Sequence, residues 1–523
     1  MKRILALLLC LVSLVACFAG AGCKKGLSEE QKQNALIIEY YKAGYGEVWI
    51  QNLAAAYTEK TGQEVVLLPR SGNEGLSTMA TSLKSGTAHT DLFFTSNPSF
   101  DDVYQGRANI NGTIYDSWYA DLSSVYNATI EGENIKVKDK MHDAFEDYYK
   151  MPDDGKYYSG KYYFFPWVTG MIGIVVNMDV WNEVATGKEF PRTTNELLEL
   201  CADIKDETSP LIYSLGDEYF TSFYQIFMNQ YEGNEGMDKF YAGYSPNGED
   251  RYDTNMVAYD GFLKTLEFFE EWLKPENGYS HPDSASLTFM QMQGAFLNGA
   301  ALMNINGDWL EREMLTKYPD ANIAVMKTPV LSAVADKTSF KDNANREAIL
   351  RAAIDYVDGK TATIPAECSA DDIAYIREAR AIEYNTGNAT IALVPSYSNQ
   401  IESAKDFLIF MASDEGMRIF SDGTSGCELP FNYTTPYTPA KISTFRSSIN
   451  DALAVSEKRF VNNKDRIFSA GGVSVYLYNN SIGRFVKAFT STTDRKTAAQ
   501  YFNAEVSAVN KMLNEAKRQA GLI

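Results

Sequence analysis

The stretch YYFFPWVTGMIGIVVN, residues 162–177, divides the sequence into two parts with different patterns. Two apolar runs of strand composition flank PWVTG, residues 166–170, and the proline and glycine of this segment interrupt them. The segment therefore marks a break at which one group of predicted elements ends and another begins.

Upstream of this break, strands alternate with helices. We expect strands at residues 35–40 (ALIIEY), 65–68 and 91–95. Between them lie a glycine-punctuated loop (YKAGYG, residues 41–46) and an amphipathic helix with Trp49, Leu53, Ala56 and Tyr57 on one face. This alternation predicts βαβ units, an α/β fold and a mainly parallel sheet.

Downstream of the break, the clearest helix start is at Thr193, where Glu196 three residues later completes a capping-box pattern. Leu197, Cys201 and Ile204 follow at helical spacing and predict a buried face. Further elements are expected as a helix, an Asn298-Gly299 turn and a strand within 289–305, an insertion at 341–390, a strand at 391–395, helices at 403–411 and 415–420, and a long helix at 494–520. A glycine-rich loop at 422–430, containing GCELP, predicts a second break.

The amino terminus has the pattern of an export signal. Lys2 and Arg3 precede an apolar run of about 13 residues, which is too short to span a membrane but is typical of a signal peptide. Small residues then precede Cys17 and Cys23, as in a bacterial lipobox. We expect a lipoprotein signal peptide at 1–22, a lipid on Cys23 with Cys17 as the alternative, and a polar tether at 23–34. An uncleaved membrane anchor and a plain secretory signal are the other interpretations.

Length and charge limit the class of protein. A chain of 523 residues exceeds what one core usually supports, so two or three domains are expected. The net charge of −20 repels phosphate backbones and argues against nucleic acid as a partner. Beyond the leader, Cys201 is expected in a core, and a Cys368–Cys427 disulfide is one open alternative.

Enzyme motifs are missing from the sequence. His89, His142 and His281 have no metal-ligand spacing, and neither a phosphate-binding loop, a dinucleotide fingerprint nor a nucleophile elbow occurs. We therefore expect no catalysis, no cofactor and no metal. A glycosidase-like pair of carboxylates stays open, because its separation is a property of the fold.

Aromatic residues give the positive evidence, with 33 tyrosines and 6 tryptophans. Flat rings suit the C–H faces of sugars, whereas polar side chains suit the hydroxyl edges. The aromatics beside glycines in predicted loops are the candidates for stacking, although core packing is the competing interpretation; they are Tyr41, Tyr45, Trp167 and Trp309. Hydrogen bonds are expected from Asn73 and Glu74, in a predicted SGNEG loop, and from Asp308.

The order of segments over roughly residues 35–432 resembles the extracellular solute-binding proteins of carbohydrate ABC importers, the group that includes maltose-binding protein. The resemblance depends on the lipobox leader, a Gly-Tyr-Gly loop before a helix, YYFFPWVTGMIGIVVNMDVW followed by FPRTTNELLEL, FLNGAALMNINGDW, and ALVPSYSNQIESAKDFLIFMASDEGMRIF followed by LPFN. In this alignment Trp309 matches a cleft-facing aromatic of the family.

The resemblance implies a two-lobed periplasmic-binding-protein-like α/β fold with a ligand cleft between lobes that are joined by hinge crossings. One lobe would hold residues 35–165 plus 391–428, and the other 168–390 plus 430–523, with the insertion at 341–390. It implies a lipid-anchored monomer on the outer face of the cytoplasmic membrane that binds a mono- or oligosaccharide and delivers it to ABC permease subunits. An exported carbohydrate-active enzyme and a receptor for a peptide, polyamine or metal ion are the alternatives.

Overall fold

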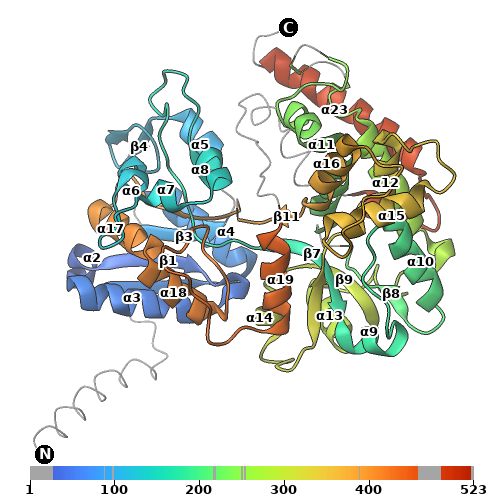
Figure 1. The fold of residues 1–523 in the computed structure, drawn as a ribbon. Coiled ribbons are helices and arrows are strands. Elements are labelled where there is room, and N and C mark those ends of the chain that lie inside the picture. Colours follow the sequence, from blue (N-terminus) through green and yellow to red (C-terminus); the bar gives the residue numbers. More distant parts are fainter. Residues whose placement is uncertain are drawn as a thin grey trace, which may run out of the picture.

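The computed structural model describes residues 27–519, except 87–88, 97–98, 216–218, 249–250, 253–254, 388 and 457–483. Two α/β lobes lie side by side, each built around its own sheet (Figure 1). The predicted signal peptide, Cys17 and Cys23 lie outside the described residues. Within the described part, no helix is both long enough and apolar enough to cross a membrane.

The first lobe contains a five-stranded sheet in the order β2-β1-β3-β12-β6. Strand β1 (Leu36–Tyr41) lies between β2 (Val65–Arg70) and β3 (Leu92–Ser96) and is parallel to both, as the alternating pattern predicts. Strand β12 (Thr390–Leu393) is antiparallel to β3 and to the short β6 (Phe165–Pro166). The other elements of this lobe are α2 (Glu29–Asn34), η1 (Ala43–Tyr45), α3 (Val48–Thr61), α4 (Gly72–Ser85), α5 (Phe100–Gln105), β4 (Ala108–Ile110), β5 (Thr113–Tyr115), α6 (Ser123–Asn127), α7 (Val137–Lys140), α8 (Asp143–Tyr149), α17 (Ile401–Ala412) and α18 (Asp414–Thr424).

The second lobe has a sheet in the order β10-β7-β9-β8. Strand β7 (Met171–Asn177) is antiparallel to β9 (Ala301–Gly307), to β10 (Ile323–Met326) and to β11 (Tyr384–Asn385), and only β8 (Ser209–Leu211) runs parallel to its neighbour β9. The mainly parallel arrangement predicted from the segments before residue 162 therefore does not extend to this lobe. The regular strand–helix alternation behind it covers only the first part of the chain.

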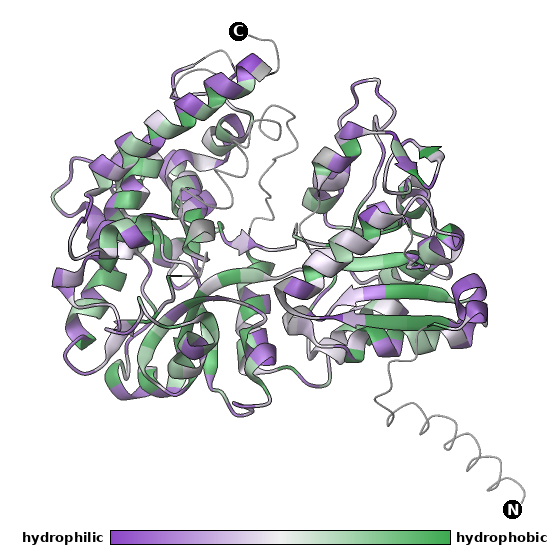
Figure 2. Cartoon of the chain, turned by 180° about the vertical axis from the view of Figure 1, so that it is seen from behind, coloured by the Kyte–Doolittle hydropathy of each residue, from purple (hydrophilic) through white to green (hydrophobic). Residues whose placement is uncertain are grey.

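Helices surround the second sheet, and the insertion at 341–390 is part of its core. Ile349, Leu350 and Ile376 of the insertion pack in the same apolar cluster as Leu302 and Ile305 of β9. The helices of this lobe are α9 (Met178–Val184), α10 (Thr194–Ile204), α11 (Tyr219–Tyr241), α12 (Asp260–Leu273), η2 (Pro275–Asn277), α13 (Phe289–Leu297), α14 (Leu310–Met314), η3 (Ser332–Lys337), α15 (Arg346–Val357), α16 (Ala370–Arg380), α19 (Thr444–Ala454), α22 (Phe485–Thr490) and α23 (Ala498–Gln519). In both lobes the strands are mostly hydrophobic and the outer helices carry hydrophilic surfaces (Figure 2).

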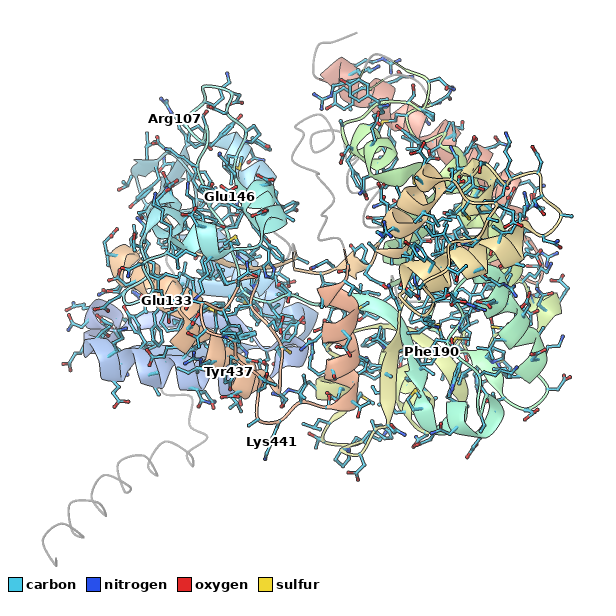
Figure 3. All side chains as sticks on the ribbon, in the orientation of Figure 1. Arg107, Glu133, Glu146, Phe190, Tyr437 and Lys441 are labelled. Carbon is cyan, nitrogen blue, oxygen red and sulfur yellow. The ribbon has the colours of Figure 1, made fainter. Side chains whose placement is uncertain are left out.

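Within the residues that the structure describes, the chain passes between the lobes three times. The first crossing joins β6 to β7 through 167–170, and the second joins β11 to β12 through 386–389. The last crossing was expected at GCELP, but Leu429 and Phe431 still pack in the core of the first lobe. The chain therefore crosses at 432–443, where Tyr437 and Lys441 are labelled in Figure 3, and α19 begins the return to the second lobe. GCELP instead pairs with the first crossing, since the Thr169 N–H donates to the Glu428 carbonyl (2.8 Å).

Two local predictions also need correction. Part of the expected tether is helix α2, because Ser28 and Gln31 form a capping box at its start. Helix α4 begins at Gly72, so Asn73 and Glu74 lie in its first turn rather than in a loop. An acidic residue is favourable there, next to the positive end of the helix dipole.

The three described cysteines, Cys201, Cys368 and Cys427, are unpaired. Cys427 lies in the core of the first lobe, whereas Cys368 packs at the edge of the core of the second lobe, so the Cys368–Cys427 disulfide is excluded. Cys201 is buried on the inner face of α10, as its helical spacing predicts.

Candidate functional site

A cavity of about 310 Å³ lies between the lobes beside the first two crossings. Both lobes supply its walls, and six of its lining residues are aromatic. The first lobe contributes Tyr41, Gly44, Tyr45, Leu76, Thr95, Ser96, Trp167 and Thr390, and the second lobe and the second crossing contribute Ile172, Tyr219, Trp309, Glu313, Tyr384, Thr386 and Ala389.

Trp309 stands on the wall of the second lobe, between the end of β9 and the start of α14. Its ring lies over Gly307, where an added Cβ would lie 2.3 Å from the indole. The indole N–H donates to the Tyr219 hydroxyl (3.0 Å), and the two ring centroids are 5.7 Å apart. The indole is partly exposed and its polar edge is already bonded, so its remaining free surface is apolar.

Trp167 lines the cavity but is part of the core of the first lobe. Its side chain is 0% exposed, and its ring stacks on Trp49 with centroids 5.0 Å apart and an interplanar angle of 15°. The Tyr45 ring packs against it at nearly a right angle. The indole therefore supports the wall from within the core. A ring face open to a ligand was expected from the sequence, but the position of Trp167 does not provide one.

Asp308 lies behind the wall rather than in it. It is 1% exposed, and Arg446 of α19 donates to its Oδ2 and to its backbone carbonyl, both at 2.9 Å. Tyr45 of the first lobe donates its hydroxyl to Oδ1 (3.3 Å). Burial raises the pKa of Asp308, and Arg446 opposes this by favouring the charged carboxylate. Both carboxylate oxygens thus have protein partners. Asp308 was expected to accept hydrogen bonds from sugar hydroxyls, but in the structure it bonds the two lobes together through Tyr45.

The two lobes make close contact beside this ion pair. A Cβ on Gly44 would lie 1.9 Å from the Cβ of Trp309, so only glycine fits between η1 and the start of α14. Arg312 of α14 also donates to the carbonyl of Gly423 at the end of α18 (2.8 Å). These contacts fix η1, which carries the buried Tyr45, against the start of the segment that carries Trp309.

The remaining predicted site residues separate into two groups. Tyr41 lines the cavity, and burial together with the nearby Glu313 carboxylate raises its pKa. Glu74 is not among the lining residues and is exposed on α4, which reaches the cavity through Leu76, and Asn73 precedes it in the first turn of the same helix.

Sequence reasoning missed Tyr219, Tyr384 and Thr386. Tyr219 begins a helix, and a helical aromatic is usually a core residue. Tyr384-Asn385-Thr386-Gly387, however, joins an aromatic, an amide and a hydroxyl to a glycine directly before a strand. An aromatic residue near a glycine was the criterion that selected Tyr45 and Trp309. The same criterion selects this segment, but it lies in the predicted insertion, where no site residue was expected.

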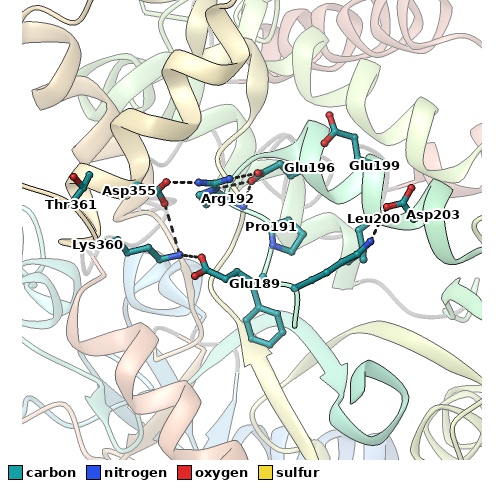
Figure 4. Close-up of a pocket in the computed structure, with 12 residues that line it drawn as sticks. Glu189, Pro191, Arg192, Glu196, Glu199, Leu200, Asp203, Asp355, Lys360 and Thr361 are labelled. Carbon is teal, nitrogen blue, oxygen red and sulfur yellow. Dashed lines mark hydrogen bonds and ion pairs between the residues drawn. The ribbon is translucent and has the colours of Figure 1, made fainter. Parts of the chain in front are cut away.

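A larger hollow of about 620 Å³ lies wholly on the second lobe, between α10, α15, the loop before α10 and the loop after α15 (Figure 4). Its charged walls are paired with one another: Arg192 lies between Glu196 and Asp355, and Lys360 contacts Glu189. No crossing borders it. Within the described residues, no three His, Cys, Asp or Glu side chains gather as a metal site would require.

Comparison with known proteins identifies the family. Residues 43–418 match the family described as bacterial extracellular solute-binding protein. The chain belongs to this family. Members of this family bind solutes, and the cavity between the lobes of this solute-binding protein is the place where a solute can contact both lobes. Arg446, which holds Asp308, follows the matched region.

Solved structures share the fold of this solute-binding protein at low sequence identity. One, titled as a bacterial solute receptor AcbH with a preference for β-D-galactopyranose, has a TM-score of 0.60 and 12% identity and covers 94% of this chain and 100% of its own. Another, from work on xylan utilization by the thermophilic bacterium Caldanaerobius polysaccharolyticus, has a TM-score of 0.57 and 13% identity. It covers 93% of this chain and 99% of its own. A third, SBP RafE in complex with raffinose, has a TM-score of 0.54 and 14% identity. It covers 92% of this chain and 100% of its own. No curated protein matches the chain.

Proposed function

We propose that this solute-binding protein captures a mono- or oligosaccharide between its lobes and delivers it to the permease of an ABC importer. The observation that carries this proposal is the aromatic lining of the cavity, to which the partly exposed rings of Tyr41 of one lobe and Trp309 of the other both contribute. Flat rings on both sides suit the two C–H faces of a pyranose, and the hydroxyls of Ser96 and Thr386 suit its edges. Two proteins of the same fold are described with raffinose and with β-D-galactopyranose, which supports a sugar as the ligand of this chain.

Binding requires no covalent chemistry in this proposal. A sugar that contacts both lobes stabilises the closed arrangement over the open one, and the crossings absorb the change. The permease then recognises the closed receptor, which acts as a monomer.

A thermal-shift panel tests the proposal. D-galactose, raffinose, xylotriose and maltotriose are compared with a tripeptide, putrescine and zinc chloride at equal concentration. A ligand that binds only the folded state stabilises it by RT ln(1 + [L]/Kd), about 2.7 kcal/mol at 100 times Kd. We expect one sugar to raise Tm. A rise with the tripeptide, putrescine or zinc alone contradicts the proposal, and so does release of reducing ends from an oligosaccharide panel.

We further propose that the mature protein begins at Cys23 and carries a lipid there, which holds it on the outer face of the cytoplasmic membrane. Two acyl chains on one cysteine are sufficient for stable anchoring. The test expresses the full chain with Cys23→Ser or Cys17→Ser and follows the protein in membrane and soluble fractions. We expect only C23S to leave the membrane, and mass spectrometry of the amino-terminal peptide checks the modified residue. Release by C17S alone would assign the lipid to Cys17.

A further inference from the structure

Thr386 occupies an unusual position in the wall of the cavity. It lies on the second crossing and is 5% exposed. Its Oγ1 has no hydrogen-bond partner among the described residues. None of the other described residues that line the cavity has a buried side-chain polar atom without a partner. A buried hydroxyl without a partner costs stability, so native proteins rarely keep one without a reason.

The backbone of Thr386 is fixed to the first crossing, and its hydroxyl lies beside Gly170. The Thr386 backbone N–H donates to the carbonyl of Gly170 on the first crossing (2.9 Å). A Cβ on Gly170 would lie 2.8 Å from Thr386 Oγ1 and 2.4 Å from Asp308 Oδ1, so the missing side chain of Gly170 leaves room for both oxygens. The oxygens of Asp308 are already bonded to Arg446 and Tyr45, whereas the Thr386 hydroxyl has no bond.

Thr390, four residues further along, provides the contrast within the same wall. Its Oγ1 donates to the carbonyl of Val168 (3.3 Å) and is therefore satisfied within the protein. Burial alone thus does not explain the free hydroxyl of Thr386, because a neighbouring threonine with similar burial has a partner.

We infer that the Thr386 hydroxyl is a specificity-determining group that hydrogen-bonds one hydroxyl of the bound sugar. The inference rests on the proposed function and names the protein group that hydrogen-bonds the sugar. The same contact would attach the sugar to the crossing itself, since the backbone of Thr386 bonds the two crossings together. A sugar that lacks the contacted hydroxyl would leave Thr386 unpaired inside the closed site and would be rejected.

The experiment compares three variants by isothermal titration and thermal melting. The probes are D-galactose, raffinose, xylotriose and maltotriose, each with the full chain. Thr386→Val removes the hydroxyl at constant shape, and Thr386→Ser keeps it. Thr265→Val is the control, since Thr265 is buried in α12 of the second lobe and its hydroxyl bonds the Gly261 carbonyl (2.7 Å).

For the sugar that binds the wild type, we expect T386V to raise Kd about tenfold and T386S to stay within about threefold. The Tm of the sugar-free T386V protein should be unchanged or higher, whereas T265V should lower Tm and keep the wild-type Kd. A T386V protein with lower Tm and unchanged Kd overturns the inference and assigns the hydroxyl a structural role, for example toward a buried water. If none of the four sugars binds the wild type, the proposed function fails first, and with it the inference.

Discussion

Arg446 and Asp308 form an ion pair (Nη1 to Oδ2, 2.9 Å) that is buried where the lobes meet. Asp308 directly precedes Trp309, and Arg446 lies on α19, which follows the third crossing and lies beside the junction of the lobes (Figure 1). The segment that follows the family match therefore holds the backbone that presents the central aromatic of the cavity.

Replacing Arg446 with Met should lower the free energy of unfolding by about 3–5 kcal/mol, because it leaves the Asp308 carboxylate buried without its cationic partner. Urea denaturation measures this loss. Arg346→Met is the matched control, since the exposed Arg346–Asp336 pair (2.7 Å) should contribute at most about 1 kcal/mol. Equal losses in the two variants would contradict a special role for the buried pair.

Asp414 should make the protein sensitive to acid. Burial pushes the pKa of Asp414 upward, but hydrogen bonds from the buried Lys140 and from Thr434 and Thr435 outweigh this and hold it well below 3.8. The stability that the ionised Asp414 contributes to the folded state is therefore fully present above pH 3.8. It is lost as the pH falls below that value toward the lowered pKa of the folded protein.

Melting curves between pH 5 and pH 2.5 test this expectation. The Asp414→Asn variant should be less stable at pH 5 by about 2 kcal/mol and should lose less stability on acidification than the wild type. Asp320→Asn, at an exposed position, should follow the wild-type curve. Parallel curves for D414N and the wild type would show that other groups control the acid transition.

Trp309→Ala should weaken sugar binding about tenfold or more, and Trp309→Phe should recover part of the loss, because a ring face for stacking is restored. Isothermal titration with the sugar found in the thermal-shift panel measures both. Trp118→Ala is the control, since Trp118 is also partly exposed but lies outside the cavity, beneath the Lys84 ammonium. The stacking role is refuted if W309A and W118A bind alike.

Gly44→Ala should separate η1 from Trp309, because the added Cβ would lie 1.9 Å from that residue's own Cβ. We expect a loss of about 1–3 kcal/mol in stability from overpacking, and weaker sugar binding because the two aromatic walls no longer face each other correctly. Gly46→Ala, in the same loop, meets nothing within 4 Å and should cause only the backbone strain of its φ of 72° and ψ of −157°, about 1–3 kcal/mol. Similar sugar affinities for the two variants would argue against the close contact.

Much of the local structure is present in the sequence, because strands and helices are recognised from patterns among near neighbours. The expected strand at 35–40 is β1 at Leu36–Tyr41, and Thr193 begins a helix by accepting the Glu196 N–H (3.2 Å). The break at residues 166–170 is likewise the first crossing between the sheets. Apolar period, caps and glycines are enough for such predictions.

Only the tertiary structure decided which residues face the cavity. Trp167 and Trp309 both lie beside glycines in the sequence, yet one stacks inside a core and the other stands on the wall. Asp308 has the composition of a sugar ligand, but a partner 138 residues away occupies its carboxylate. Burial and pairing depend on contacts between distant segments, and no local pattern records them. The sequence by itself therefore determined many local elements and the first crossing, whereas the packing of the two lobes against each other determined which side chains a solute can contact.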